Sequence, residues 1–131
     1  MKQQPEYILQ KAVCQYISIQ YPNVMFLSDT IAAVRLTIPQ QIRNKAIQKE
    51  GFKCPDLLIL HPNKYFSGLF IELKAKTPYK GNGEILKNIH LEAQQETLNK
   101  LNYLGYHACF VWSFEDCKHI IDNYMQDAEP Y

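Results

Sequence analysis

The stretch FKCPDLLILHPNKYFSGLFIELKAK, residues 52–76, carries the pattern that decides the fold. It holds two short apolar runs, Leu57–Leu60 and Leu69–Leu73, joined by the polar segment HPNKYFSG. Runs of this length with so short a connection predict two neighbouring strands that pair directly as a hairpin. Charged residues interrupt both runs, because Asp56 opens the first and Glu72 and Lys74 lie in or just after the second. Burying a charge is costly unless it is paired.

The alternation of a strand explains where these charges point. Residues i and i+2 share one face, so Glu72 and Lys74 look into one site while Leu73 faces the core. Antiparallel pairing brings Asp56 near Glu72. Two close carboxylates both stay ionised only when something positive sits between them, and a hard divalent cation such as Mg²⁺ is the usual solution. A metal, two carboxylates and an ammonium suit the hydrolysis of a phosphodiester bond.

The remaining chain alternates helical and strand patterns. We expect helices where apolar residues recur at helical spacing and strands where β-branched and aromatic residues gather. The expected helices are Pro5–Gln20, Pro39–Glu50 (ended by Gly51), His90–Leu104 (capped by Gly105) and Phe114–Met125 (with Ser113 as N-cap). The expected strands are Val24–Leu27, Ala32–Leu36, Leu57–Leu60, Gly68–Lys76 and Tyr106–Trp112. This order predicts one α/β domain over residues 1–131, a mixed β-sheet flanked by helices.

The segment Thr77–Asn88 separates the second strand of the hairpin from the next helix. It is rich in glycine, and Asn82-Gly83 is a strong signal for a type I′ turn. We therefore expect an exposed hairpin flap here.

Composition excludes several classes of protein. The chain has 131 residues, of which 47% are apolar, which is too many for a disordered chain. We expect a cytoplasmic protein, because no apolar run is long enough for a membrane helix and the N-terminus lacks a signal-peptide pattern. The four cysteines fit no zinc spacing. The net charge is +1, but cations gather at residues 30–54 and 74–87 and acids after Ser113.

Pro55-Asp56 followed by Glu72-Leu73-Lys74 resembles the signature of the PD-(D/E)xK nuclease superfamily. Three further features resemble its VRR-NUC branch. They are Glu6 in the first helix, Gly51 just before the Pro-Asp strand, and Gln94 near the start of HLEAQQETLNKLNYLGYHACFVW. The ending FEDCKHIIDNYM resembles the terminal helix of that family, so the resemblance runs from Glu6 to Tyr124.

The chain departs from the simplest family pattern in two places. The insert AKTPYKGNGEILKNIHLEA, residues 75–93, looks like that of small stand-alone phage and prophage members, whose Lys-Asn-x-His stretch is matched by Lys87, Asn88 and His90. The Val-Arg-Arg signature is reduced to a single Val34-Arg35.

The resemblance implies a restriction-endonuclease-like core of αβββαβ type and a Mg²⁺- or Mn²⁺-dependent DNA endonuclease. It implies that Glu6, Asp56, Glu72 and the Leu73 carbonyl hold the metal, that Lys74 positions or activates water, and that Gln94 supports water or phosphate. From the flap, DNA contacts are expected from Lys76, Lys80, Lys87 and His90. Branched DNA, including Holliday junctions, is a candidate substrate, and cutting such a junction calls for a homodimer.

Simpler interpretations stand beside this one. Glu72 and Lys74 can form a surface ion pair, Asp56 can cap a turn, and Glu6 can favour the helix dipole. A catalytically silent nucleic-acid-binding module with the same fold is one alternative function. A protein that binds a partner through its acidic last helix is another.

Overall fold

The computed structural model describes residues 4–28 and 35–128 of the chain. Apart from the strand expected at Ala32–Leu36, these residues form helices and strands in the order expected from the sequence. The helices are α1 (Gln4–Gln20), α2 (Ile38–Ile47), α3 (Ile89–Tyr103) and α4 (Phe114–Gln126). The strands are β1 (Phe26–Ser28), β2 (Leu57–Ile59), β3 (Leu69–Leu73) and β4 (His107–Val111).

The four strands form one mixed sheet in the order β1-β2-β3-β4. Strands β2 and β3 pair antiparallel, with Leu57 opposite Ile71 and Ile59 opposite Leu69, so the predicted hairpin is confirmed. Strand β1 pairs antiparallel with β2, and β4 runs parallel to β3 after the crossover through α3. The architecture is the expected mixed α/β sheet flanked by helices.

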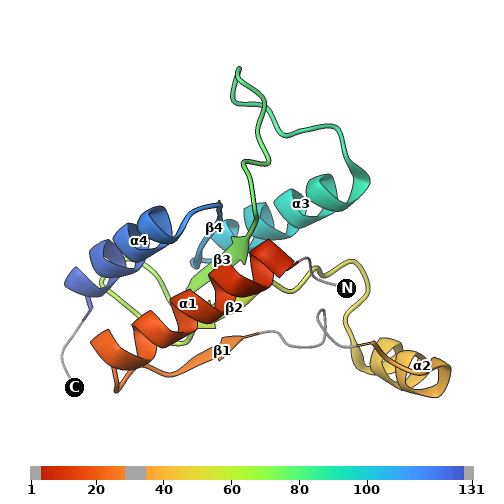
Figure 1. Ribbon diagram of the computed structural model, residues 1–131, viewed down its shortest axis with the longest axis horizontal. Coiled ribbons are helices and arrows are strands. Elements are labelled where there is room, and N and C mark those ends of the chain that lie inside the picture. Colours follow the sequence, from red (N-terminus) through yellow and green to blue (C-terminus); the bar gives the residue numbers. More distant parts are fainter. Residues whose placement is uncertain (1–3, 29–34, 129–131) are drawn as a thin grey trace.

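Helices cover both faces of the sheet, and the alternation of β3 distributes its side chains between them (Figure 1). One core joins α1 and α4 to Leu69, Ile71 and Leu73 of β3. The second core joins Leu98 and Leu101 of α3 to Phe70, and to Ala108 and Phe110 of β4. Glu72 follows the same alternation as Phe70, so it faces α3, while Leu73 is buried on the side of α1, as predicted.

Local signals set the ends of the helices. The Ser113 hydroxyl accepts a hydrogen bond from the Asp116 N–H at 3.1 Å and begins α4 as predicted. Gly105, with φ +101°, follows the end of α3.

Helix α2 differs from its prediction at its carboxyl end. It ends at Ile47, earlier than the predicted Glu50, because Gln48 is already extended and its N–H bonds to the Lys45 carbonyl. Gly51 takes a positive φ of 78° three residues later. All ten residues of α2 are described and none of them is buried, and the helix projects from the sheet in Figure 1.

The predicted flap is present, but its turn is of a different type. Tyr79 pairs with Ile85, and the Gly83 N–H donates to the Lys80 carbonyl while the Lys80 N–H donates to Glu84. A type I′ turn needs positive φ at both central residues. Among the described residues only glycines have positive φ, so Asn82 excludes that turn, and Gly83 alone supplies the left-handed position (φ 87°) of a three-residue loop.

Strand boundaries shift by a few residues elsewhere. The strand predicted at Val24–Leu27 is β1, Phe26–Ser28, and the strand predicted as Gly68–Lys76 ends at Leu73. Of the strand predicted at Ala32–Leu36, residues 32–34 lie outside the described residues, and Arg35 and Leu36 are not in a strand. Within the described ranges, no helix is both long and apolar enough to span a membrane.

Candidate active site

The two carboxylates singled out by the sequence meet at one end of the sheet. Asp56 directly precedes β2, and Glu72 lies in β3. Extending the register by one residue beyond the Leu57–Ile71 pair sets Asp56 opposite Glu72. Opposed residues of antiparallel strands point to the same face. Asp56 is 4% exposed and Glu72 is 5% exposed, so both carboxylates are buried.

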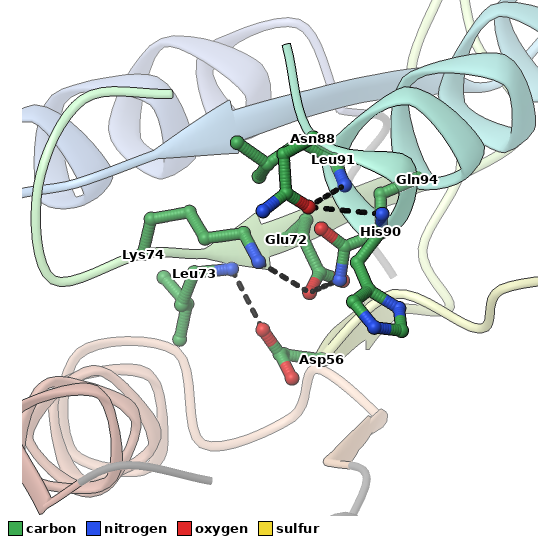
Figure 2. A network of polar contacts seen from close by, with 8 residues as sticks. All are labelled: Asp56, Glu72, Leu73, Lys74, Asn88, His90, Leu91 and Gln94. Carbon is green, nitrogen blue, oxygen red and sulfur yellow. Dashed lines mark hydrogen bonds and ion pairs between the residues drawn. The ribbon is translucent and has the colours of Figure 1, made fainter. Parts of the chain in front are cut away.

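Glu72 lies between an amide and an ammonium. Its Oε1 accepts a hydrogen bond from Gln94 Nε2 at 2.9 Å and lies 3.8 Å from Lys74 Nζ (Figure 2). The side chains of Lys74 and Glu72 are 17% and 7% exposed. Glu72 and Lys74 therefore do not form a solvated surface ion pair, and the simpler interpretation of these two residues is wrong.

Asp56 is tied to the same strand through its backbone. The Asp56 Oδ2 atom accepts a hydrogen bond from the Leu73 N–H at 2.8 Å, and both partners are buried (Figure 2). A carboxylate that accepts a backbone N–H makes a strong, charge-assisted bond. Both acidic side chains are thus held at the carboxyl end of β3, where the strand leaves the sheet.

The start of α3 brings Gln94 and His90 to this place. Asn88 caps the helix, since its Oδ1 accepts from the His90 N–H at 2.9 Å and from the Leu91 N–H at 3.1 Å (Figure 2). His90 and Gln94 are one helical turn apart and share a face, as predicted. Gln94 Oε1 is buried and accepts no hydrogen bond from any described residue, so it is an acceptor available to a water or ligand.

An open cavity of about 330 Å³ lies beside these groups. Four predicted residues line it, namely Glu6 from α1, Lys74, Lys76, and His90 from α3. Lys80 and Lys87 lie outside its lining, on exposed parts of the flap, and Lys80 Nζ is 3.9 Å from Glu84 Oε2. Lys74 therefore connects the cavity to the polar network, while Asp56, Glu72 and Gln94 do not line the cavity and the two flap lysines face solvent.

The donor chemistry of this place fits a divalent cation. Carboxylate and carbonyl oxygens are the ligands that Mg²⁺ prefers, and Mg²⁺ needs few protein ligands because it keeps waters or binds substrate phosphates. Asp56, Glu72 and the Gln94 Oε1 atom supply such oxygens. Among residues 4–28 and 35–128, no three His, Cys, Asp or Glu side chains are grouped to hold a metal, so Glu6 is not drawn into a three-carboxylate cluster.

Sequence reasoning missed one residue near the site. Gln10 is buried on α1, and its Nε2 donates to the Asp56 carbonyl at 3.3 Å and to Ser28 Oγ. The signal was present in the sequence, because Gln10 falls on the same helical stripe as the buried Val13 and Ile17. A polar residue on a core-facing stripe needs buried hydrogen-bond partners.

Comparison with known proteins finds a likeness among solved structures. No model of a known protein family matches the chain, and no curated protein matches it. Among solved structures, a VRR_NUC domain protein aligns with a TM-score of 0.62 and 21% sequence identity, over 98% of this chain and 94% of that one. The chain has the fold of a VRR_NUC domain protein. The likeness extends over nearly the whole chain, and at 21% identity it shows the fold alone. It confirms the restriction-endonuclease-like architecture expected from the sequence.

Proposed function

We propose that this chain is a Mg²⁺- or Mn²⁺-dependent endonuclease that hydrolyses phosphodiester bonds in DNA. The observation that carries the proposal is the pair of buried carboxylates, Asp56 and Glu72, opposite each other at a strand end beside the Lys74 ammonium. Two carboxylates against one ammonium leave a net negative site, which favours binding of a cation. The VRR_NUC fold supports the same proposal.

Each residue of the site has a role in this reaction. Asp56, Glu72 and the Leu73 carbonyl would hold the ion, with Glu6 acting from the rim of the cavity. When bound, the ion lowers the pKa of a coordinated water and offsets negative charge on the phosphate. The Lys74 ammonium, held near Glu72, orients the attacking water. Gln94 holds the Glu72 carboxylate through Nε2, and its buried Oε1 would accept a hydrogen bond from water.

The substrate that suits the surroundings is a polyanion. Lys76 and His90 line the cavity, and Lys80 and Lys87 stand on the flap beside it. These basic side chains would contact the phosphates next to the cut bond, since phosphate contacts position a protein on DNA.

Branched DNA is the substrate class that we propose. One chain has one such centre and cuts one strand. Cleavage of two strands of a four-way junction therefore needs a homodimer, whose two-fold symmetry would match that of the junction.

The first experiment measures strand cleavage of linear and four-way-junction DNA with and without Mg²⁺. Wild-type protein should cut only with the metal. Glu72→Ala should lower the rate by about a hundredfold or more, because it removes a group that acts on the transition state, while its DNA affinity stays close to that of wild type. Glu96→Ala is the matched control, since Glu96 is an exposed carboxylate on α3 that pairs only weakly with Lys100.

Three results would contradict the proposal in different ways. A Glu72→Ala variant that still cuts at the wild-type rate would remove Glu72 from the site. Wild-type protein that binds DNA without cutting it, with either Mg²⁺ or Mn²⁺, would be a silent binding module. Wild-type protein that neither binds DNA nor gains thermal stability with Mg²⁺ would point to the protein-interaction alternative.

A further inference from the structure

Gln10 is a polar residue in the apolar stripe of α1. The buried residues of this helix are Gln10, Val13 and Ile17, and Gln10 is only 6% exposed. The positions of Val13 and Ile17 are occupied by apolar side chains that pack against the sheet. A glutamine at such a position is stable only where its amide finds hydrogen-bond partners, so its contacts indicate what it does.

The amide of Gln10 connects three elements around the site. Its Nε2 donates to the backbone carbonyl of Asp56 at 3.3 Å and to Ser28 Oγ at the end of β1. The bond to Asp56 is buried. It therefore ties α1 to the residue that immediately precedes β2.

The same helix carries another residue of the site. Glu6 lies one turn before Gln10 and shares its helix face, and Glu6 lines the cavity together with Lys74. Fixing Gln10 against the Asp56 backbone thus also fixes the distance between α1 and the strand end that carries both buried carboxylates.

We propose that Gln10 is a positioning residue. Its amide holds the Asp56 backbone so that the Asp56 carboxylate reaches the Leu73 N–H and stays opposite Glu72, with Glu6 at the rim. The positioning rests on the hydrogen bonds alone. Its consequence for metal binding rests on the proposed function.

The test compares Gln10→Met with Gln15→Met in the full chain. Methionine keeps the length of glutamine without its amide, and Gln15 is an exposed glutamine on the same helix. The first measurement is amide hydrogen exchange at two adjacent residues. The Leu73 N–H donates to Asp56, whereas the Lys74 N–H donates to the Val111 carbonyl and serves as the internal reference. The second measurement is the affinity for Mn²⁺, followed by the electron paramagnetic resonance signal of the free ion.

Gln10→Met should speed exchange at Leu73 by roughly fivefold or more, the size expected for the loss of one net hydrogen bond, and leave Lys74 unchanged. Mn²⁺ affinity should fall by a similar factor, and Gln15→Met should change neither. Equal exchange at Leu73 in Gln10→Met and wild type would overturn the proposal. So would parallel acceleration at Leu73 and Lys74, which would make Gln10 a general core residue. Wild-type protein that binds no Mn²⁺ would instead contradict the proposed function. The exchange rates at Leu73 and Lys74 would still show whether Gln10 positions Asp56.

Discussion

At the scale of single residues, the burial of Asp56 and Glu72 is what separates this site from a surface ion pair. Carboxylates at the surface gain little from a nearby ammonium. Here the Glu72 carboxylate is fixed by Gln94 and Lys74, and the Asp56 carboxylate by the Leu73 N–H. Groups held this firmly keep their geometry before a substrate arrives, and such preorganisation accounts for much of the effect of a charged site on a reaction rate.

A second polar cluster lies between α1 and α4, around the partly exposed Asp122, and it offers a prediction of pH dependence. Asp122 accepts hydrogen bonds from the hydroxyls of Tyr16 and Tyr21 and from Lys118 Nζ at 3.1 Å. Burial on its own would raise the pKa of Asp122, but the hydrogen bonds from these three residues outweigh it and hold the pKa below its ordinary value of 3.8.

A carboxyl group with a lowered folded-state pKa stabilises the fold at pH values above its unfolded pKa. That contribution is lost as the pH falls from roughly 5 through the lowered pKa. Asp122→Asn should therefore unfold more easily than wild type at neutral pH and show a shallower loss of stability on acidification. The measurement is the free energy of unfolding by urea at a series of pH values. Parallel curves for the two proteins would contradict the assignment.

At the scale of elements, the flap is the segment that we propose contacts DNA. Its base is fixed, since Pro78 is fully buried and the Tyr79 ring packs edge-on against Phe110 and Trp112. The residues from Lys80 to Glu84 are exposed. This tip carries one cation and one anion, Lys80 and Glu84, while the exposed Lys76 and Lys87 flank the flap and are placed to contact phosphates.

Changing Lys76, Lys80 and Lys87 together to glutamine should weaken DNA binding and flatten its salt dependence. The slope of log affinity against log salt should fall by up to about 0.9 for each phosphate that the variant no longer neutralises. Fluorescence anisotropy of labelled DNA at several salt concentrations measures this slope. A control with the same net charge replaces Lys11, Lys64 and Lys100, which are exposed and lie outside the cavity lining. Equal slopes in the two triple variants would show that net charge, and not the position of the flap lysines, sets the salt dependence of DNA binding.

Helix α2 should contribute little to the stability of the fold, because its apolar side chains are exposed. Ile42 is 65% exposed, whereas Ile17 of α1 is fully buried. Ile42→Ala should change the free energy of unfolding by no more than about 0.5 kcal/mol. Ile17→Ala should cost about 2–5 kcal/mol, because it leaves a cavity in the core. Urea unfolding of the two variants measures both values. A large loss of unfolding free energy for Ile42→Ala would mean that α2 packs against the rest of the domain.

At the scale of the whole molecule, periodicity predicted the arrangement better than local turn chemistry did. Helical and strand periods identified α1, α3, α4 and the hairpin of β2 and β3 within a few residues, because each buries a continuous apolar face. The predicted end of α2 and the predicted type of the flap turn are wrong. They depend on the backbone of Gln48 and Asn82, and no buried face constrains either one.

In the site, too, periodicity predicted some features and left others unpredicted. Alternation along β3 was sufficient to orient Glu72, Leu73 and Lys74, and the structure confirms it. The role of Asn88 as a helix cap and the contact of Gln10 with Asp56 were not foreseen. The contact of Gln10 joins segments far apart in the chain, and a single sequence carries no direct record of it. The Asn88 cap is local, and the preference of asparagine for helix N-caps is a signal that the sequence does carry.

The most direct test of the proposed centre is the anomalous scattering of Mn²⁺ in crystals of the full chain soaked in that ion. The proposal predicts a peak bonded to carboxylate oxygens of both Asp56 and Glu72, beside the Lys74 ammonium. Crystals soaked at a Mn²⁺ concentration that supports DNA cleavage, but with no peak at those two carboxylates, would contradict it.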